Sequence, residues 1–352
     1  MEEQQEPAPE KKWTRHVVTA FKVAVVLMLA VVVTDWFNNP LGGVRPAAHF
    51  LQPASGARGK ASQSFSQADV YFSRGYAFSE NHDYDAAIAE YSMVIKIDPK
   101  YANAWYNRGQ AYFFKGDYDA AIRDYSKAIR INPKDADAYV GRGCAYSGKG
   151  DYDAAIRDYG KAIALDPQNG DAYARRGIMY GEKDDYDAAI RDFDKAIALD
   201  PEDAIAYANR GYARAEKGDY DAALQDANKA IGLTPKDARA YATRGYVYVR
   251  KGDYDAALQD YDKAIELDPA CDSAYQNRGD VYLERGDYDD AIREFGKAIG
   301  LAPEADAETY HKRGEAYRKK GDYDAALRDA AKAAELNPKY ADALRQLREA
   351  GK

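Results

Sequence analysis

Residues 102–135, ANAWYNRGQAYFFKGDYDAAIRDYSKAIRINPKD, make up a unit that recurs along the chain. Its Arg-Gly pair returns at intervals of 34 residues, except for the last interval, which is 35 residues long. The pairs that mark the repeats, numbered 1 to 8 here, are Arg74-Gly75, Arg108-Gly109, Arg142-Gly143, Arg176-Gly177, Arg210-Gly211, Arg244-Gly245, Arg278-Gly279 and Arg313-Gly314. A fixed period of this size indicates a repeat architecture, in which each unit buries its apolar face against its neighbours.

Each unit is predicted to be two helices joined by a tight turn. Trp105 and Gly109 lie four residues apart, which is a helical spacing. Gly116 is expected to end the first helix, because glycine adopts the left-handed conformation at little cost. Asp117 is a good N-cap for a second helix, and Pro133 is expected to end that helix because proline cannot continue its hydrogen bonds.

The unit closely resembles the tetratricopeptide repeat, a family pattern of aromatic and small residues at fixed positions. The matching residues of repeat 2 are Trp105, Gly109, Tyr112, Ala121, Tyr125, Ala128 and Pro133. One departure is constant: Arg108 and its seven equivalents stand where the family usually has leucine. The resemblance covers residues 68–352 and implies an all-α fold, a right-handed superhelical α-solenoid of helix-turn-helix repeats.

Composition and periodicity divide the chain into five segments. Residues 1–12 are polar and predicted to be a disordered tail, and residues 13–37 are predicted to be a transmembrane signal-anchor helix. Residues 38–67 are rich in Pro, Gly, Ser and Ala, as is typical of a flexible linker. The eight repeats occupy residues 68–338, and residues 339–352 are predicted to be the polar-backed capping helix that a solenoid end needs.

The run Val17–Phe37 is the one strongly apolar stretch of the sequence, with Lys22 near its start and Asp35 near its end. Trp13 and Trp36 would be about 34 Å apart in a helix, which suits aromatic anchors at two membrane interfaces. We favour a membrane-spanning anchor for this run. A cleaved signal peptide and a buried or interfacial helix remain the alternatives.

Basic residues predict the orientation of this anchor. Lys11, Lys12, Arg15 and Lys22 lie in or before the apolar run, whereas the first base after it is Arg45. The positive-inside rule therefore keeps the N-terminus in the cytoplasm and exports the repeats, into the periplasm if the source is a bacterium.

The composition argues against several classes of function. A net charge of −8 disfavours a nucleic-acid partner, which would want a basic surface. The four histidines are scattered along the chain, so they predict no metal cluster. We find no set of nucleophile, base and acid in the sequence, and therefore expect no enzyme activity, no cofactor and no small-molecule substrate.

The family resemblance implies a site on the concave face formed by the first helices, where an extended protein or peptide segment would bind. Asparagine can hold a peptide backbone by donating and accepting hydrogen bonds together. Tyrosine offers apolar area with a polar tip. The residues that the resemblance places in this groove are Asn107, Arg175, Asn209, Tyr212, Tyr246, Asn277 and Lys312.

One variant of the family grips a C-terminal carboxylate with lysine, asparagine and arginine residues from three consecutive repeats. Asn277 and Lys312 are fragments of that set, but Gln276 and Glu308 occupy places that would need other residues. A receptor for chaperone tails is therefore disfavoured. We expect a membrane-anchored protein–protein interaction scaffold, and the alternative is a structural or oligomerisation module of a membrane complex that acts through its outer face.

Repeat 5 lacks two framework aromatics. Arg214 stands where the equivalent residues of the neighbouring repeats are Tyr180 and Tyr248, and Ala227 stands where they are Phe193 and Tyr261. Because truncating a buried aromatic side chain usually destabilises its surroundings, we expect residues 204–237 to open more readily than repeats 3 and 7.

Overall fold

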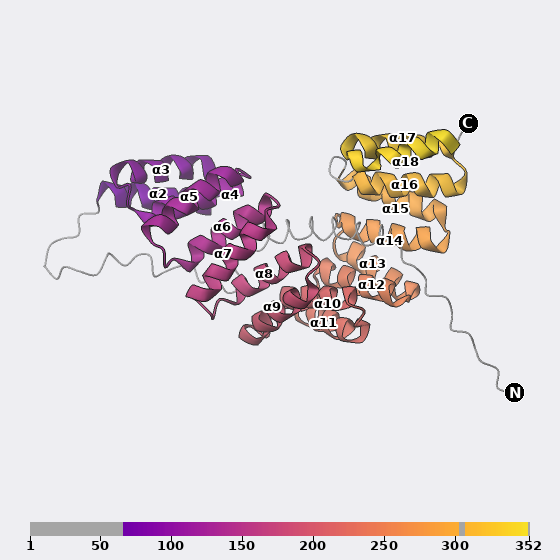
Figure 1. Ribbon diagram of the computed structural model, residues 1–352, viewed down its shortest axis with the longest axis horizontal. Coiled ribbons are helices and arrows are strands. Elements are labelled where there is room, and N and C mark those ends of the chain that lie inside the picture. Colours follow the sequence, from indigo (N-terminus) through magenta and orange to yellow (C-terminus); the bar gives the residue numbers. More distant parts are fainter. Residues whose placement is uncertain (1–65, 303–306, 351–352) are drawn as a thin grey trace. The chain divides into compact units, whose positions relative to one another are not determined.

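The computed structural model describes residues 66–302 and 307–350, and in these residues it is entirely helical (Figure 1). The predicted all-α array of paired helices is therefore confirmed for this part of the chain. The predicted tail, the predicted anchor and nearly all of the predicted linker lie outside the described residues. None of the described helices combines the length and apolar character that a membrane span requires.

The described residues belong to two units, 66–236 and 237–350. The helices of the first unit are α2 (Gln67–Glu80), α3 (Tyr84–Ile97), α4 (Ala102–Phe114), α5 (Tyr118–Ile131), α6 (Ala136–Gly148), α7 (Tyr152–Leu165), α8 (Gly170–Glu182), α9 (Tyr186–Leu199), α10 (Ala204–Glu216) and α11 (Tyr220–Leu233). Those of the second are α12 (Ala238–Lys251), α13 (Tyr254–Leu267), α14 (Asp272–Arg285), α15 (Tyr288–Leu301), α16 (Ala307–Lys320), α17 (Tyr323–Leu336) and α18 (Ala341–Ala350). Within each unit, consecutive helices pack side by side.

The turn inside each repeat has the predicted chemistry. Gly116 follows α4 with a φ of +79°, in the left-handed region that glycine tolerates. The Asp117 carboxylate accepts a 3.0 Å hydrogen bond from the backbone N–H of Ala120 and so caps α5. In repeats 1 and 4 the left-handed position is held by His82 and Asp184. The predicted end of the first helix and start of the second are therefore confirmed.

In repeats 1 to 4, 6 and 7 the repeated glycine of the first helix lies under an aromatic ring of the second helix. A Cβ on Gly143 would lie 2.7 Å from Cε1 of Tyr159, and one on Gly177 would lie 2.9 Å from Cε1 of Phe193. No side chain larger than hydrogen fits there unless the ring moves. The rings themselves are buried, and burial raises the pKa of Tyr159 well above its ordinary value.

The repeated arginine next to that glycine forms a fork with a buried acid on the second helix of the same repeat. In repeat 4, Arg176 donates from Nε and Nη2 to the two carboxylate oxygens of Asp192, at 2.7 and 2.8 Å. The acid comes 16 residues after the arginine in repeats 2 to 8 and is only 1–7% exposed. These acids are Asp124, Asp158, Asp192, Asp226, Asp260, Glu294 and Asp329.

Where the chain offers an acceptor, the remaining Nη1 of the arginine reaches the second helix of the preceding repeat. Arg108 donates to Ser92 Oγ at 2.8 Å, and Arg210 donates to Asp194 at 2.6 Å. The guanidinium also lies over the aromatic ring three residues before it, with Cζ 4.9 Å from the ring centre of Trp105 in repeat 2. One side chain therefore joins two helices of its own repeat to the repeat before it.

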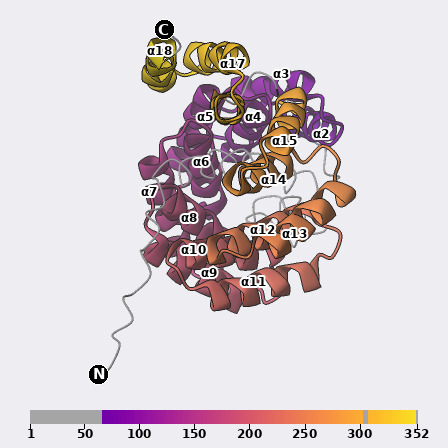
Figure 2. The same ribbon diagram turned by 90° about the vertical axis from the view of Figure 1, so that its right-hand side faces the viewer.

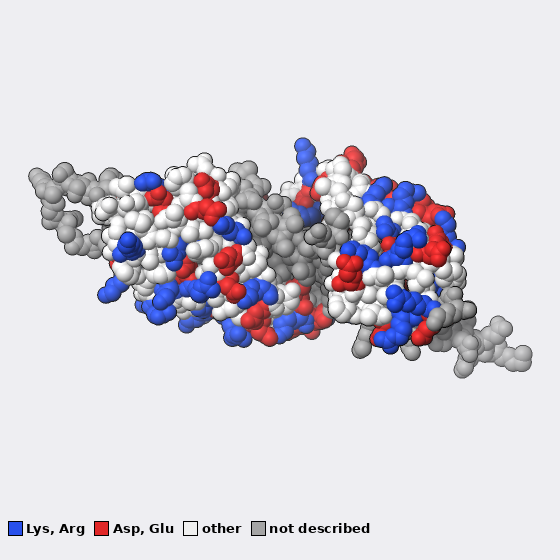
Figure 3. Space-filling model, turned by 90° about the horizontal axis from the view of Figure 1, so that it is seen from above, with Lys and Arg blue, Asp and Glu red and all other residues white. Residues whose placement is uncertain are grey.

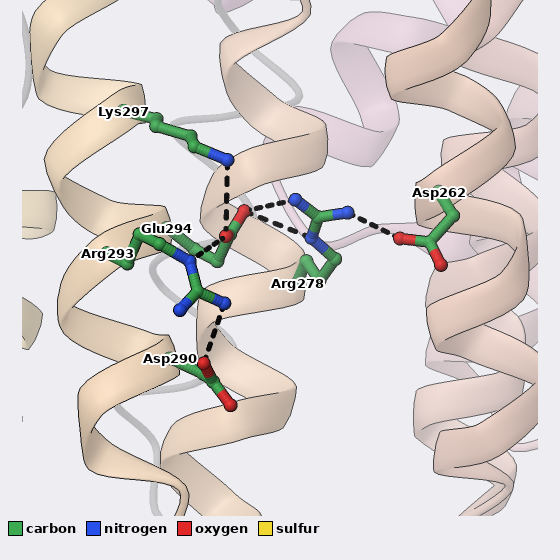
Figure 4. Close-up of polar contacts among 6 residues, drawn as sticks. All are labelled: Asp262, Arg278, Asp290, Arg293, Glu294 and Lys297. Atoms are coloured by element: carbon green, nitrogen blue, oxygen red, sulfur yellow. Dashed lines mark hydrogen bonds and ion pairs between the residues drawn. The ribbon is translucent and has the colours of Figure 1, made fainter.

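Repeat 7 carries glutamate instead of aspartate at the buried position, and its longer side chain gathers three cations (Figure 4). Glu294 pairs with Arg278, with Arg293 at 3.3 Å and with Lys297 at 3.5 Å. The Nη1 of Arg278 meanwhile pairs with Asp262 on α13. Burial lowers the pKa of Arg278, and the carboxylates of Glu294 and Asp262 outweigh that effect, so its net pKa is raised.

A second set of ion pairs runs between neighbouring repeats at the surface. Lys149 at the end of α6 pairs with Asp119 in the first turn of α5, and Lys183 pairs in the same way with Asp153. The lysine lowers the pKa of Asp119, chiefly through its hydrogen bond. These side chains are exposed, so each pair adds little to stability. Acids and bases are interspersed on the face in Figure 3.

In repeat 5 the arginine that replaces one of the missing rings has a partner. Arg214 donates to Asp226 at 2.7 Å, beside the fork from Arg210 to the same carboxylate. No ring covers Gly211, and the backbone carbonyl of Ala223 would lie 3.1 Å from a Cβ there. The sequence prediction included no partner for Arg214. Its ion pair with Asp226 offsets part of the stability lost with the ring contact.

The C-terminal end of the second unit is closed by α18, which packs on α17 (Figures 1 and 2). Leu347 is buried against Ala326 and Ala330, with Leu344 packed beside it. The outer face is polar, and the side chain of Arg345 is 70% exposed.

The fork yields a test of what the arginine contributes. In the full chain, Arg176→Leu restores the family's usual residue but leaves the Asp192 carboxylate buried without its cation. We expect a loss of about 3–5 kcal/mol in the local free energy of unfolding, measured by native-state hydrogen exchange of α8 and α9 amides. The double variant Arg176→Leu/Asp192→Ala should recover much of that loss.

The exposed Arg191→Leu is the control for removing one charge from the same repeat, and should change stability by less than about 0.5 kcal/mol. Protection in Arg176→Leu equal to that of the unaltered protein would show that the fork does not stabilise the helix pair.

Candidate functional site

All seven residues of the predicted groove lie on first helices. Asn107, Arg175, Asn209 and Tyr212 belong to the unit 66–236, on α4, α8 and α10. Tyr246, Asn277 and Lys312 belong to the unit 237–350, on α12, α14 and α16. Each unit therefore carries its own part of the predicted site.

Two of the predicted asparagines bond back to their own helix. The Nδ2 of Asn107 donates to the carbonyl of Asn103 at 2.8 Å, and that of Asn209 donates to the carbonyl of Ile205 at 2.9 Å. Both side chains are half-buried. Among the described residues no donor reaches either Oδ1, so in this conformation the amide oxygen is the atom that can meet a ligand N–H. Simultaneous donation to a ligand requires the internal bond to break.

Arg175 is buried in a polar cluster of the first unit. Its Nε donates to both carboxylate oxygens of Asp171, at 2.7 and 2.8 Å, and its guanidinium lies beside the thiol of Cys144. Tyr159 donates to that sulfur at 3.4 Å. Burial lowers the pKa of Arg175, and the Asp171 carboxylate outweighs it, so the net pKa is raised. Burial also raises the pKa of the Cys144 thiol.

The two predicted tyrosines differ in how much ring area they offer. Tyr212 is half-buried and packs edge-on against Tyr186, with ring centres 6.4 Å apart. Tyr246 is only 4% exposed, and its hydroxyl accepts a 2.7 Å hydrogen bond from Nη1 of Arg250. In this conformation Tyr246 supports the helix rather than presenting a ring to a ligand.

The second unit brings Asn277 and Lys312 onto adjacent first helices, α14 and α16. We call the group around them the α14–α16 polar cluster. Its members are Gln276, Asn277, Asp280, Glu308, Thr309 and Lys312. Gln276 donates to the Thr309 hydroxyl at 2.6 Å, and Lys312 donates to Asp280 at 2.7 Å.

Asn277 is a member of this cluster with an unused hydrogen-bond donor. It is 3% exposed, and its Nδ2 has no acceptor among the described residues. A buried donor without a partner is unfavourable by about 1–3 kcal/mol, and such groups are uncommon in folded proteins. The donor is inaccessible in this conformation, so an acceptor from a bound chain would satisfy it only after neighbouring side chains move aside. On that condition it marks a candidate ligand-binding point on this helix.

The charge of the cluster restricts the ligand. Lys312 carries one positive charge, whereas Asp280 and Glu308 carry two negative charges, so the net charge is −1. The Nζ of Lys312 lies 2.7 Å from Asp280 and 3.6 Å from Glu308. This lysine is committed to neighbouring acids, and a ligand carboxylate would be repelled. The cluster suits a neutral acceptor, such as a peptide carbonyl.

Sequence reasoning missed Asp280 and Thr309 as members of this site. Thr309 is 2% exposed and stands where the first helices of repeats 2 to 7 carry alanine. A polar residue at a position otherwise held by a buried alanine is a readable signal, and it was not used. The pairing of Gln276 with Thr309, 33 residues apart, was not readable, because it depends on how adjacent first helices face each other.

Comparison with known proteins identifies the family to which these repeats belong. Sequence models of the tetratricopeptide repeat match residues 75–116, 102–135, 136–169, 159–191, 180–238, 243–306 and 307–340. The chain belongs to the tetratricopeptide repeat family. Members of this family typically have no enzymatic activity and bind peptide segments of partner proteins, so the chain is assigned to the protein–protein interaction scaffolds of this family.

Solved structures share the fold at low sequence identity. A tetratricopeptide repeat protein from Parabacteroides merdae is 22% identical, with a TM-score of 0.60, and the match covers 67% of this chain and 93% of that one. Yeast Tom70 is 19% identical with a TM-score of 0.60, over 86% of this chain and 67% of its own. YrrB, described as a TPR protein with an unusual peptide-binding site, is 26% identical with a TM-score of 0.44, over 52% and 95% of the two chains. No curated protein sequence matches the chain.

The α14–α16 polar cluster can be tested without a ligand. Asn277→Ala removes a donor that has no partner among the described residues, and it also removes the packing of a buried side chain. The gain and the loss oppose each other, so we expect the free energy of unfolding to change by less than about 1 kcal/mol. Gln276→Ala breaks the bond to Thr309 and should lower it by about 1–3 kcal/mol. Urea unfolding of the two variants, followed by circular dichroism, compares adjacent residues of the same helix. An equal loss in both would mean that Asn277 has an internal partner.

Proposed function

We propose that the protein is a membrane-anchored scaffold that binds an extended segment of a partner protein along the first helices of its repeats. The observation that carries the proposal is the buried Nδ2 of Asn277, which has no acceptor among the described residues. The half-buried amide oxygens of Asn107 and Asn209 support it from the other unit, since each is placed to accept from a backbone N–H.

The ligand chemistry follows from these atoms. A peptide backbone in extended form presents carbonyl oxygens and N–H groups. Within the unit 66–236 Asn107 and Asn209 supply two acceptors, and within the unit 237–350 Asn277 supplies one donor. The acids beside Lys312 argue against a terminal carboxylate at α14 and α16. Side-chain specificity would come from the residues that differ between repeats at these positions, which include Tyr212 and Arg175.

The membrane anchor in this proposal rests on sequence. Residues Val17–Phe37 are apolar over a length that suits a bilayer span. The bases before and within this run, and their absence from the 22 residues between Lys22 and the first later base, Arg45, predict an N-terminus in the cytoplasm and repeats on the far side. An exported array held close to the membrane would present its first helices to partners in that compartment.

Position-specific cross-linking in the full-length, membrane-bound protein tests the binding face. A photo-reactive residue at the half-buried Gln110 of α4 should capture the partner, whereas one at the exposed Lys161 of α7 should not. The reverse pattern would contradict the proposal and would support a structural module that acts through its outer face.

Substitution of the asparagines measures their share of the affinity for the partner so captured. The triple variant Asn107→Ala/Asn209→Ala/Asn277→Ala loses hydrogen bonds worth about 1 kcal/mol each, so we expect binding to weaken roughly a hundredfold. Gln168→Ala, in an exposed turn, is the matched amide control. Unchanged affinity in a triple variant that keeps its helical circular dichroism would refute the assignment.

Topology is tested with a reporter enzyme that works only after export, fused after Lys352. The fusion should be active, and it should lose activity when residues 13–37 are deleted, because the apolar run directs export in this proposal. Activity of a reporter that works only in the cytoplasm, placed at the same position, would contradict the predicted orientation.

A further inference from the structure

The first helix of repeat 1, α2, exposes a face that later first helices bury. Val70 is 47% exposed, whereas the equivalent residues of α4, α6, α8, α10, α14 and α16 are 0–2% exposed. Ala77, two turns along the same face, is also exposed, and its equivalents in those helices are 0–5% exposed. Between them lies Arg74, whose side chain is 57% exposed, against 12–22% for its equivalents.

The corresponding face of α4 shows what normally covers it. Ala104 packs in a cluster with Val94 and Ile95 of α3, and Ala111 packs in a cluster with Ala87 and Tyr91 of α3. Arg108, between the two alanines, donates to Ser92 of α3 at 2.8 Å. The three positions therefore form a docking face for a helix that carries apolar residues on both sides of one hydrogen-bond acceptor.

In repeat 1 the ion pair between the repeated arginine and its acid is incomplete, as expected where no helix covers the arginine. Arg74 makes one contact with its buried acid, from Nη2 to Oε1 of Glu90 at 2.6 Å, in place of the two-pronged fork. The Oε2 of Glu90 is buried and accepts no hydrogen bond from any described residue. A covering helix would exclude water from Arg74 and hold its guanidinium over Glu90, as the later repeats do.

The rim of this face is apolar where the other repeats are charged. Met93 of α3 is 37% exposed and stands where the other seven second helices carry lysine. Exposed apolar side chains grouped on one surface mark interaction sites. We call Val70, Arg74 and Ala77, with Met93 at the rim, the α2 face.

We propose that the α2 face binds an amphipathic helix of another protein, one that places a hydroxyl or a carboxylate opposite Arg74. The bound helix occupies the place that the second helix of a preceding repeat would take. This site is separate from the proposed groove, because it lies at the first end of the array and recognises a helix instead of an extended segment.

Two features disfavour a second copy of this chain as the occupant. If α2 packed antiparallel against α2 of another copy, the two Arg74 guanidinium groups at the centre would repel each other. The end of the array in the second unit is covered by α18, whose outer face is charged. Within their units, α3, α5, α7, α9, α13 and α15 already use their apolar faces against the first helices that follow them.

A synthetic helix tests the proposal with the full-length protein in detergent. The probe is a fluorescent peptide with the sequence of residues 117–133, the helix that covers α6 and supplies Ser126 to Arg142 at 3.0 Å. Fluorescence anisotropy should show saturable binding. Arg74→Gln should weaken it about tenfold, because one charge-assisted hydrogen bond is lost, and Val70→Arg should abolish it.

Matched controls separate this contact from general charge effects. Arg123→Gln removes an exposed arginine from α5 and should leave peptide binding unchanged. A peptide with Ser126→Val should bind the unaltered protein about tenfold more weakly than the original peptide does. The Arg74→Gln protein should bind both peptides with the same affinity, because it lacks the arginine that the serine contacts. Equal affinity of the Arg74→Gln and unaltered proteins, or no binding at millimolar peptide, would overturn the proposal.

Two further measurements identify a different occupant. If sedimentation equilibrium shows a dimer that Arg74→Gln disrupts, a second copy covers the face. If a cross-linker at Val70→Cys joins residues 1–65 of the same chain, the protein covers the face itself. Both native cysteines are buried, so the introduced thiol reacts selectively. Either result contradicts binding of a foreign helix.

Discussion

The fork between an arginine of the first helix and a buried acid of the second fixes how the two helices of a repeat face each other. A leucine would fit many orientations, but a guanidinium with two parallel hydrogen bonds to one carboxylate fits few. A slip of one residue would leave the acid buried without its cation, which is strongly unfavourable. The third arm of the guanidinium extends this constraint to the preceding repeat, as from Arg108 to Ser92.

Much of the fold was readable from local sequence because its determinants are local. Gly116 and Asp117 act within one turn, so their roles follow from residue type alone. The fork was not recognised, although both of its members recur, because Arg108 was compared with the family pattern and not with the acid 16 residues later. The partner of Arg214 was not recognised for the same reason, since Asp226 lies on the other helix.

The candidate site depended more on tertiary arrangement. The family pattern places Asn107, Asn209 and Asn277 at equivalent positions, yet two of them bond to their own helix while the third is buried with an unused donor. Lys312 looks like a ligand-binding cation in sequence, and only the positions of Asp280 and Glu308 show that it is already neutralised.

The 34-residue spacing of the fork also bears on how such a chain changes length during evolution. Both members of a fork lie inside one unit, and the third arm needs only a serine or aspartate from the unit before. A duplicated copy of residues 102–135, inserted in register, would bring its own arginine and acid and would offer Ser126 to the next arginine. Unequal recombination can therefore lengthen or shorten the array without creating an unpaired buried charge at the new junction.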